Sequence, residues 1–291
     1  MALLESALAR VLAAVLSALS TLGGTAPVAG AQTTAPESYV AIGDSYTAGP
    51  GILFQRGDPV GCFRSDHNYP QLVARAGGSV LRDVSCSGAA TDDLFAPQDV
   101  FGGPNPPQLA AVDAEVDVVT VQIGGNDIGF TEILERCAAP LPLGTPCQDT
   151  YVVGGVDELS RRIAATAPKV AAALAEVRRR SPGAEVFVVG YPAILPEVQP
   201  GCWPLMPITP GDVPYLRDIE KRLNAMLAAQ ATAAGATYVD VYGPSIGHDA
   251  CQLPGVRWVE PLIPVPPVAP VHPNGLGMER MAAIVTAAMA G

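Results

Sequence analysis

Short runs of apolar residues, each ended by glycine or by small polar residues, recur along the chain. The run at 116–123 (VDVVTVQI) is apolar or β-branched at every position except Asp117 and Gln122. A continuous run of this length is typical of a strand that is buried on both faces. The same pattern predicts five strands, at residues 39–44, 79–84, 116–123, 185–189 and 237–242.

Between these runs, the spacing of the apolar residues changes to that of helices. The longest helix is predicted at 157–180, with a kink at Pro168, because one face carries Leu159, Ile163, Val170, Leu174 and Val177. We predict further helices over 70–76, around 216–227 and from Asn274 onward. Strands that alternate with helices imply right-handed crossovers and a three-layer α/β/α domain with a parallel sheet.

Ser45 follows the first predicted strand directly. The apolar run Tyr39–Ile42 is broken by Gly43 and Asp44, which places Ser45 on the turn that leaves the carboxyl end of the strand. Open parallel sheets bind ligands at this edge. Ser45 is therefore a candidate nucleophile, although many turn serines only form hydrogen bonds with the local backbone.

A second serine, Ser245, competes with Ser45. The segment 243–247 (GPSIG) matches the G-x-S-x-G nucleophile motif and also follows a strand. That motif requires a helix directly after the serine, whereas the chain continues here with the turn-rich segment 248–255. We therefore interpret Ser245 as part of a turn at the end of a strand.

The N-terminus has the pattern of an export signal. Arg10 precedes an apolar segment at 11–22, and Ala29-Gly30-Ala31 offers small residues for cleavage. We predict a signal peptide at 1–31 and one domain at 32–291, with an uncleaved anchor helix as the alternative. The formal net charge of −11 makes nucleic acid an unsuitable partner, because an acidic chain repels phosphates.

The chain has six cysteines, an even number in a sequence that we expect to be exported. This combination favours disulfides over thiol catalysis. The chain contains no C-x-x-C pair and only three histidines, His67, His248 and His272. We therefore expect no zinc or other metal site, and no cofactor.

Four short blocks, in order and spread over the whole predicted domain, give the chain a clear resemblance to a known family. They are Gly43-Asp44-Ser45, Cys86-Ser87-Gly88-Ala89, Gly124-Gly125-Asn126-Asp127 and His272-Pro273-Asn274. With these blocks the chain resembles the SGNH (GDSL-type) hydrolases, and among them the secreted actinobacterial lipases and esterases with three disulfides. The resemblance implies a flavodoxin-like fold with a five-stranded parallel sheet.

The resemblance also implies roles for four residues. Ser45 would attack an ester carbonyl and His272 would be its general base, while the backbone N–H groups of Ser45 and Gly88 and the amide of Asn126 would form the oxyanion hole. The chemistry suits these residue types, because a serine hydroxyl needs a base and an amide donates without adding charge. Taken singly, Gly88, Asn126 and His272 could each be ordinary turn or cap residues.

The family's usual acid is missing. An aspartate normally stands three residues before the histidine, and this position is Ala269 here. We therefore expect a backbone carbonyl of the segment 268–270, with Ala269 as the first candidate, to orient His272. The alternatives are the carboxylates of Asp249 and Glu260, on loops that could fold back towards the site.

The disulfide pairing rests on the resemblance and on proximity in the sequence, since six cysteines allow fifteen pairings. We expect bridges Cys62–Cys86, Cys137–Cys147 and Cys202–Cys251.

The expected function is that of a secreted, monomeric serine ester hydrolase that acts on lipid-like or aryl esters through an acyl-enzyme and makes transient contact with lipid surfaces. Two loops carry apolar residues that would either bind the acyl group or only cover the sheet edge: Trp203, Leu205, Met206, Ile208, Trp258, Leu262 and Ile263. The alternatives are a phospholipase, a carbohydrate acetyl-esterase and a non-enzymatic binding protein with a degenerate site.

Overall fold

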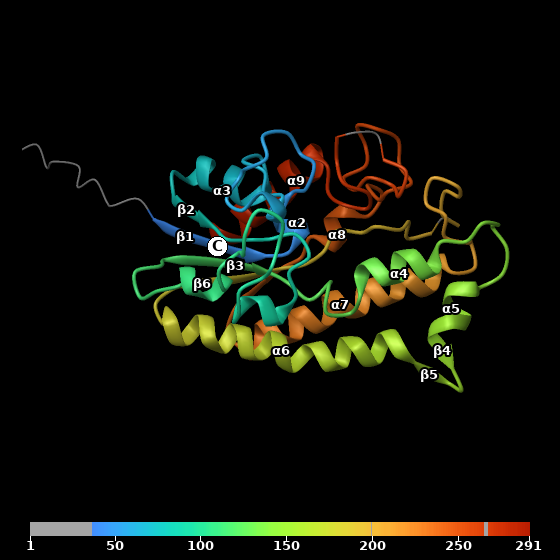
Figure 1. Ribbon diagram of the computed structural model, residues 1–291, viewed down its shortest axis with the longest axis horizontal. Coiled ribbons are helices and arrows are strands. Elements are labelled where there is room, and N and C mark those ends of the chain that lie inside the picture. Colours follow the sequence, from blue (N-terminus) through green and yellow to red (C-terminus); the bar gives the residue numbers. More distant parts are fainter. Residues whose placement is uncertain (1–36, 199, 265–266) are drawn as a thin grey trace, which may run out of the picture. The chain divides into compact units, whose positions relative to one another are not determined.

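A computed structural model describes residues 37–291 apart from 199, 265 and 266 (Figure 1). The predicted signal peptide at 1–31 lies outside the described residues. Within the described part, no helix combines the length and the apolar character needed to cross a membrane.

The sheet has five parallel strands in the order β2-β1-β3-β6-β7 (Figure 1). The strands are β1 (Ser38–Gly43), β2 (Val80–Asp83), β3 (Val118–Gln122), β6 (Glu185–Val189) and β7 (Thr237–Val239). The predicted five-stranded parallel sheet is therefore confirmed, although β7 is shorter than the predicted 237–242 because the chain turns into α8 (Tyr242–Ser245). After β1 the chain adds β2 on one side of it and β3 on the other, so the order in which strands are added changes direction between β1 and β3. Open α/β sheets bind ligands at the carboxyl ends of the strands at such a point.

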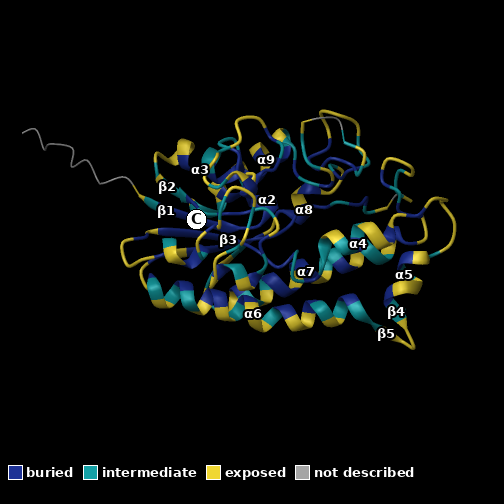
Figure 2. Cartoon of the chain, in the orientation of Figure 1, coloured by how far each residue is buried: buried dark blue, intermediate teal, exposed yellow. Residues whose placement is uncertain are grey.

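Helices cover both faces of the sheet. α6 (Glu158–Arg180) and α7 (Val213–Ala233) lie on one face, and α3 (Tyr69–Gly77) and α9 (Gly275–Met289) lie on the other (Figure 1). Successive strand residues point to opposite faces, so Val40 and Ile42 of β1 pack in the first core, and Tyr39 and Ala41 in the second. Figure 2 shows that β1 and β3, in the middle of the sheet, are almost continuously buried, whereas the edge strand β2 is only partly buried. α6 runs unbroken through Pro168.

Two short helices between β3 and α6 were not predicted from the sequence. α4 (Phe130–Cys137) and α5 (Pro146–Tyr151) follow β3, and a small antiparallel pair, β4 (Val152–Val153) and β5 (Val156–Asp157), leads on to α6. Helices of eight and six residues hold too few turns for their apolar period to stand out from the sequence.

The six cysteines form three disulfides. Cys62 pairs with Cys86, Cys137 with Cys147 and Cys202 with Cys251, with Cα–Cα distances of 4.2, 4.5 and 5.3 Å. This is the pairing that the resemblance implies. The second bridge ties α4 to α5, and the third joins the loop after β6 to the segment after α8.

Candidate active site

Ser45 is the first residue of α2 (Ser45–Ala48), a single helical turn that follows β1 directly. The turn is possible because residue 43 is glycine: a Cβ there would lie 2.1 Å from Thr47 Oγ1 and 2.9 Å from the carbonyl oxygen of Gln122. The side-chain amide of Gln108 bonds both backbone groups of Gly43, accepting from its N–H at 2.8 Å and donating to its C=O at 3.0 Å. Ser45 is thus placed at the carboxyl edge of the sheet.

The imidazole of His272 meets the hydroxyl of Ser45. Nε2 of His272 lies 2.8 Å from Ser45 Oγ, and Nδ1 lies 2.7 Å from the carbonyl oxygen of Pro270. This ring therefore has a fixed acceptor on one side and the serine on the other, as a general base requires. Burial lowers the pKa of His272, against the opposing effect of the Pro270 carbonyl, so the ring is neutral at pH 7 and can accept a proton.

The expectation for Ala269 was wrong by one residue. The acceptor for Nδ1 belongs to the predicted segment 268–270, but it is the carbonyl of Pro270. The next residue, Val271, has a φ of 57°, and this left-handed turn directs the Pro270 carbonyl back towards the ring of His272. The Ala269 N–H donates to the carbonyl of Pro50 at 3.1 Å, which ties that residue to another loop.

The two carboxylates considered as alternatives have other partners. Asp249 accepts from the N–H of Cys251 at 3.0 Å and from Gln252 Nε2 at 3.1 Å. Glu260 forms a buried ion pair with Arg257 and accepts from Asn274 Nδ2 at 2.8 Å. The observed acceptor for His272 Nδ1 is a neutral carbonyl.

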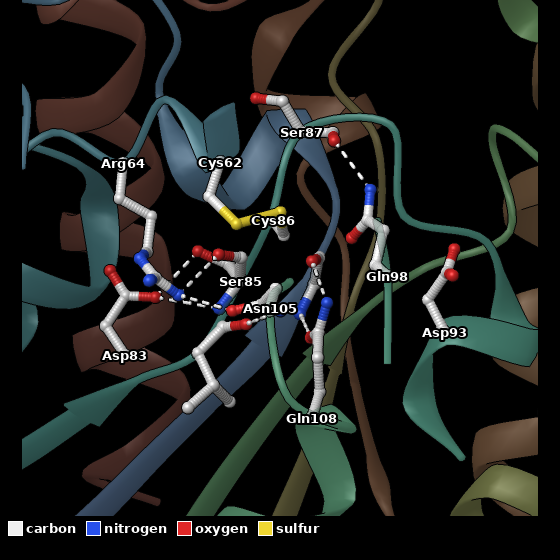
Figure 3. Close-up of a disulfide and its surroundings, with 12 residues drawn as sticks. Cys62, Arg64, Asp83, Ser85, Cys86, Ser87, Asp93, Gln98, Asn105 and Gln108 are labelled. Carbon is white, nitrogen blue, oxygen red and sulfur yellow. Dashed lines mark hydrogen bonds between the residues drawn. A yellow bond between two sulfur atoms is a disulfide. The ribbon is translucent and has the colours of Figure 1, made fainter. Parts of the chain in front are cut away.

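Asn126 and Gly88 lie on neighbouring loops. Asn126 Nδ2 donates to the carbonyl of Ala89 at 2.8 Å, which fixes the amide beside the turn that contains Gly88. Gly88 has a φ of +81°, a conformation that favours glycine. The chain just before it is held by the Cys62–Cys86 disulfide and by a bond of 2.9 Å from Gln98 Nε2 to the Ser87 carbonyl (Figure 3).

The structure reveals a further site residue, Tyr191, which the sequence analysis missed. Its hydroxyl donates to Asp44 Oδ2 at 2.5 Å and accepts from the N–H of Gly125 at 3.0 Å. It therefore joins the turn of Ser45 to the turn of Asn126. The sequence offered one indication of this role: Tyr191 lies two residues after β6, and the other turns of the site also follow strands.

Asp44 shapes the serine turn from a buried position. Its Oδ1 accepts from the N–H of Tyr46 at 2.9 Å, capping α2, while Oδ2 accepts from Tyr191. Burial raises the pKa of Asp44 to about 7, although both hydrogen bonds act in the opposite direction.

A pocket opens beside Ser45. Its walls come mainly from α4, the segment after β6, the 206–208 loop and α7. The lining residues include Asp44, Ser45, Tyr46, Asn126, Ile128, Phe130, Ile133, Leu134, Tyr191, Ile194, Leu195, Met206, Ile208, Leu216, Ile219, Glu220 and Leu223. Of the apolar loop residues expected to bind an acyl group, only Met206 and Ile208 line it. Trp258 is instead buried and stacks on His248, with ring centroids 4.8 Å apart.

Ser245 has a structural role. It is fully buried, its hydroxyl donates to the carbonyl of Tyr242 at 2.7 Å, and it accepts from the N–H of Ala193 at 2.7 Å. The G-x-S-x-G match is therefore an exposed turn at the end of a strand, in which only Ser245 is buried.

A serine hydroxyl in contact with a neutral imidazole, next to an apolar pocket at the carboxyl edge of a parallel sheet, has the geometry of the serine hydrolases. Comparison with known proteins identifies the family. Residues 41–280 match the model of the GDSL-like lipase/acylhydrolase family, so the chain belongs to this family. It is a carboxylic ester hydrolase.

Individual relatives agree with this assignment. The chain is 43% identical over 289 residues to "Lipase 2" of Streptomyces coelicolor, covering 96% of each chain. It is 30% identical over 269 residues to "Esterase" of Streptomyces scabiei, covering 79% of this chain and 77% of the relative. Among solved structures, an extracellular lipase from Streptomyces rimosus is similar with a TM-score of 0.73 at 25% identity, covering 88% of this chain and 100% of the other.

The fold also matches that of a phospholipase A1 from Streptomyces albidoflavus, with a TM-score of 0.74 at 24% identity, covering 88% of this chain and 100% of the other.

Proposed function

We propose that the protein is a secreted serine hydrolase that cleaves lipid-like or aryl carboxylic esters through an acyl-enzyme on Ser45. The observation that carries this proposal is the 2.8 Å contact between Ser45 Oγ and His272 Nε2 beside an apolar pocket. A neutral imidazole at this distance can take the hydroxyl proton as the oxygen attacks.

The first half of the reaction forms the acyl-enzyme. Ser45 Oγ bonds to the ester carbonyl carbon while its proton passes to His272 Nε2. The carbonyl oxygen becomes an oxyanion, which accepts hydrogen bonds from the N–H groups of Ser45 and Gly88 and from Asn126 Nδ2. When the intermediate collapses, the bond to the alcohol oxygen breaks and His272 returns the proton to it, releasing the alcohol.

The second half repeats this chemistry with water. His272 removes a proton from a water molecule that attacks the acyl carbon, and then returns that proton to Ser45 Oγ as the carboxylic acid leaves. Throughout the cycle, the Pro270 carbonyl keeps the Nδ1–H tautomer in place. Because this acceptor is a backbone carbonyl and not a carboxylate, the enzyme works as a Ser–His dyad. The carbonyl stabilises the imidazolium less than a carboxylate would.

The apolar walls of the pocket support an acyl chain as its occupant. The predicted signal segment at 1–31, with the domain at 32–291, and the three disulfides support secretion. We propose a monomer that makes transient contact with lipid surfaces.

The mechanism is tested with Ser45→Ala and Asn126→Ala. Ser45→Ala should abolish hydrolysis of p-nitrophenyl butyrate and labelling by an organophosphonate. Asn126→Ala should lower kcat about a hundredfold with KM little changed, because the amide acts mainly on the developing oxyanion. Persistent labelling in Ser45→Ala, or an effect of Asn126→Ala confined to KM, would refute the assigned roles.

The substrate class is tested with p-nitrophenyl esters of increasing chain length, together with a phospholipid and an acetylated sugar. A maximum at medium or long chains would support the proposal. A maximum at acetate with activity on the sugar would instead indicate a carbohydrate acetyl-esterase, and preferential release of fatty acid from the phospholipid would indicate a phospholipase.

A further inference from the structure

The pocket beside Ser45 contains a carboxyl group that the proposed mechanism does not use. Glu220 lies on α7 among apolar residues of the same wall, Leu216, Ile219 and Leu223. The other acidic residue of the pocket, Asp44, is bound by Tyr46 and Tyr191. The other α7 residues of this wall are apolar, so burying a carboxyl group among them carries a desolvation cost.

Only one oxygen of Glu220 has a hydrogen-bond partner within the described residues. Oε2 accepts from the N–H of Ile194 at 3.2 Å, whereas Oε1 is buried and unpaired. An unpaired buried polar atom destabilises the folded protein. A bound group that pairs with Oε1 would recover this cost, whereas a purely apolar chain would leave Oε1 unpaired.

The charge of Glu220 indicates the kind of group. Burial raises the pKa of Glu220 to about 8, and the negative charge of Asp249 acts in the same direction, while Lys221 opposes it. At pH 7 Glu220 is therefore mostly a neutral carboxyl, which can both donate and accept. A neutral hydroxyl has the same double capacity, and it enters an apolar pocket at a much smaller desolvation cost than an ammonium or carboxylate group.

We propose that Glu220 is a specificity-determining residue that binds a hydroxyl group on the acyl chain, so that hydroxyacyl esters are preferred substrates. This inference rests on the proposed function, because it assumes that the acyl group occupies the pocket beside Ser45. In the complex, the hydroxyl of a hydroxyacyl group forms a hydrogen bond with Glu220 Oε1. An unsubstituted chain of the same length leaves Oε1 without a partner.

The test compares p-nitrophenyl hexanoate with its 2-, 3- and 6-hydroxy derivatives at pH 7. The readout is the ratio of kcat/KM for each hydroxy ester to kcat/KM for hexanoate, taken within one variant so that differences in folded fraction cancel. We expect the wild-type ratio for at least one hydroxyl position to exceed that of Glu220→Leu by tenfold or more.

Two variants act as controls. Glu220→Gln is neutral, has nearly the same shape and keeps a donor and an acceptor, so its ratio should stay within about threefold of the wild-type ratio. Asp218→Leu makes a similar change on the solvent-exposed side of the same helix and should leave the ratio unchanged.

Ratios that agree within twofold between the wild type and Glu220→Leu at all three hydroxyl positions would overturn the inference. So would a ratio that rises in Glu220→Leu. Hydrolysis of p-nitrophenyl acetate separates this failure from failure of the proposed function. Ser45-dependent acetate hydrolysis with unchanged ratios would leave the serine mechanism standing, whereas no Ser45-dependent hydrolysis of any of these esters would remove both.

Discussion

Replacing Tyr191 by phenylalanine removes a single oxygen atom that joins two turns of the active site. That oxygen lies 2.5 Å from Asp44 Oδ2 and 3.0 Å from the N–H of Gly125. Without it, a buried carboxyl and a buried amide each lose a partner. The residues next to these groups are Ser45 and Asn126, so the distance between nucleophile and oxyanion donor depends on this link.

The expected cost in stability follows from the two bonds. A bond to a neutral amide contributes about 1 kcal/mol and a bond to a charged carboxylate about 1.5–3 kcal/mol, so Tyr191→Phe should lower the free energy of unfolding by roughly 2.5–4 kcal/mol at pH 8. Misplacement of catalytic groups by about 1 Å can cost a hundredfold in rate. We therefore expect kcat to fall about 10- to 100-fold with a smaller change in KM.

Tyr39→Phe is the matched control. The hydroxyl of Tyr39 is also buried, but it bonds Thr120 Oγ1 at 2.9 Å within the sheet and joins no site turns. This variant should lose about 1 kcal/mol of stability and keep kcat within twofold. Urea denaturation and steady-state hydrolysis of p-nitrophenyl butyrate measure both quantities. If Tyr191→Phe kept kcat within twofold of Tyr39→Phe despite its loss of stability, the positioning role would be wrong.

Three further predictions follow from the same geometry. Asp249→Asn and Glu260→Gln should each lower kcat only a few-fold, and a thousandfold loss in either would reveal a side-chain acid and refute the dyad. Because burial lowers the pKa of His272, kcat/KM should reach half its maximum below pH 6.5, and a midpoint above that value would contradict a buried neutral base. The pKa of Asp44 is about 7 in the folded protein and about 3.9 in the unfolded chain. Folding therefore takes up a proton between these pH values, and this contribution to stability is lost as the pH rises from about 4 to 7. Asp44→Asn should remove it in urea denaturation at pH 5 and 7, whereas the same pH dependence in both proteins would show that Asp44 is not the cause.

The sequence by itself determined the sheet and the residues at its carboxyl edge. The pattern of apolar residues is a local property of the sequence, so β3 could be recognised from the continuous apolar run at 116–123. Each strand ends where glycine and polar residues begin, and these ends are where Ser45, Gly88 and Asn126 lie. The positions of candidate residues could therefore be predicted before any contact between them was known.

Only the tertiary structure decided how these residues are joined. Tyr191 meets Asp44 across 147 positions of the chain, and Gln108 meets Gly43 across 65. No local pattern encodes such pairs, because they depend on which strands become neighbours. The acceptor for His272 was also decided by the fold, since it depends on the left-handed turn at Val271, a backbone conformation that β-branched residues rarely adopt.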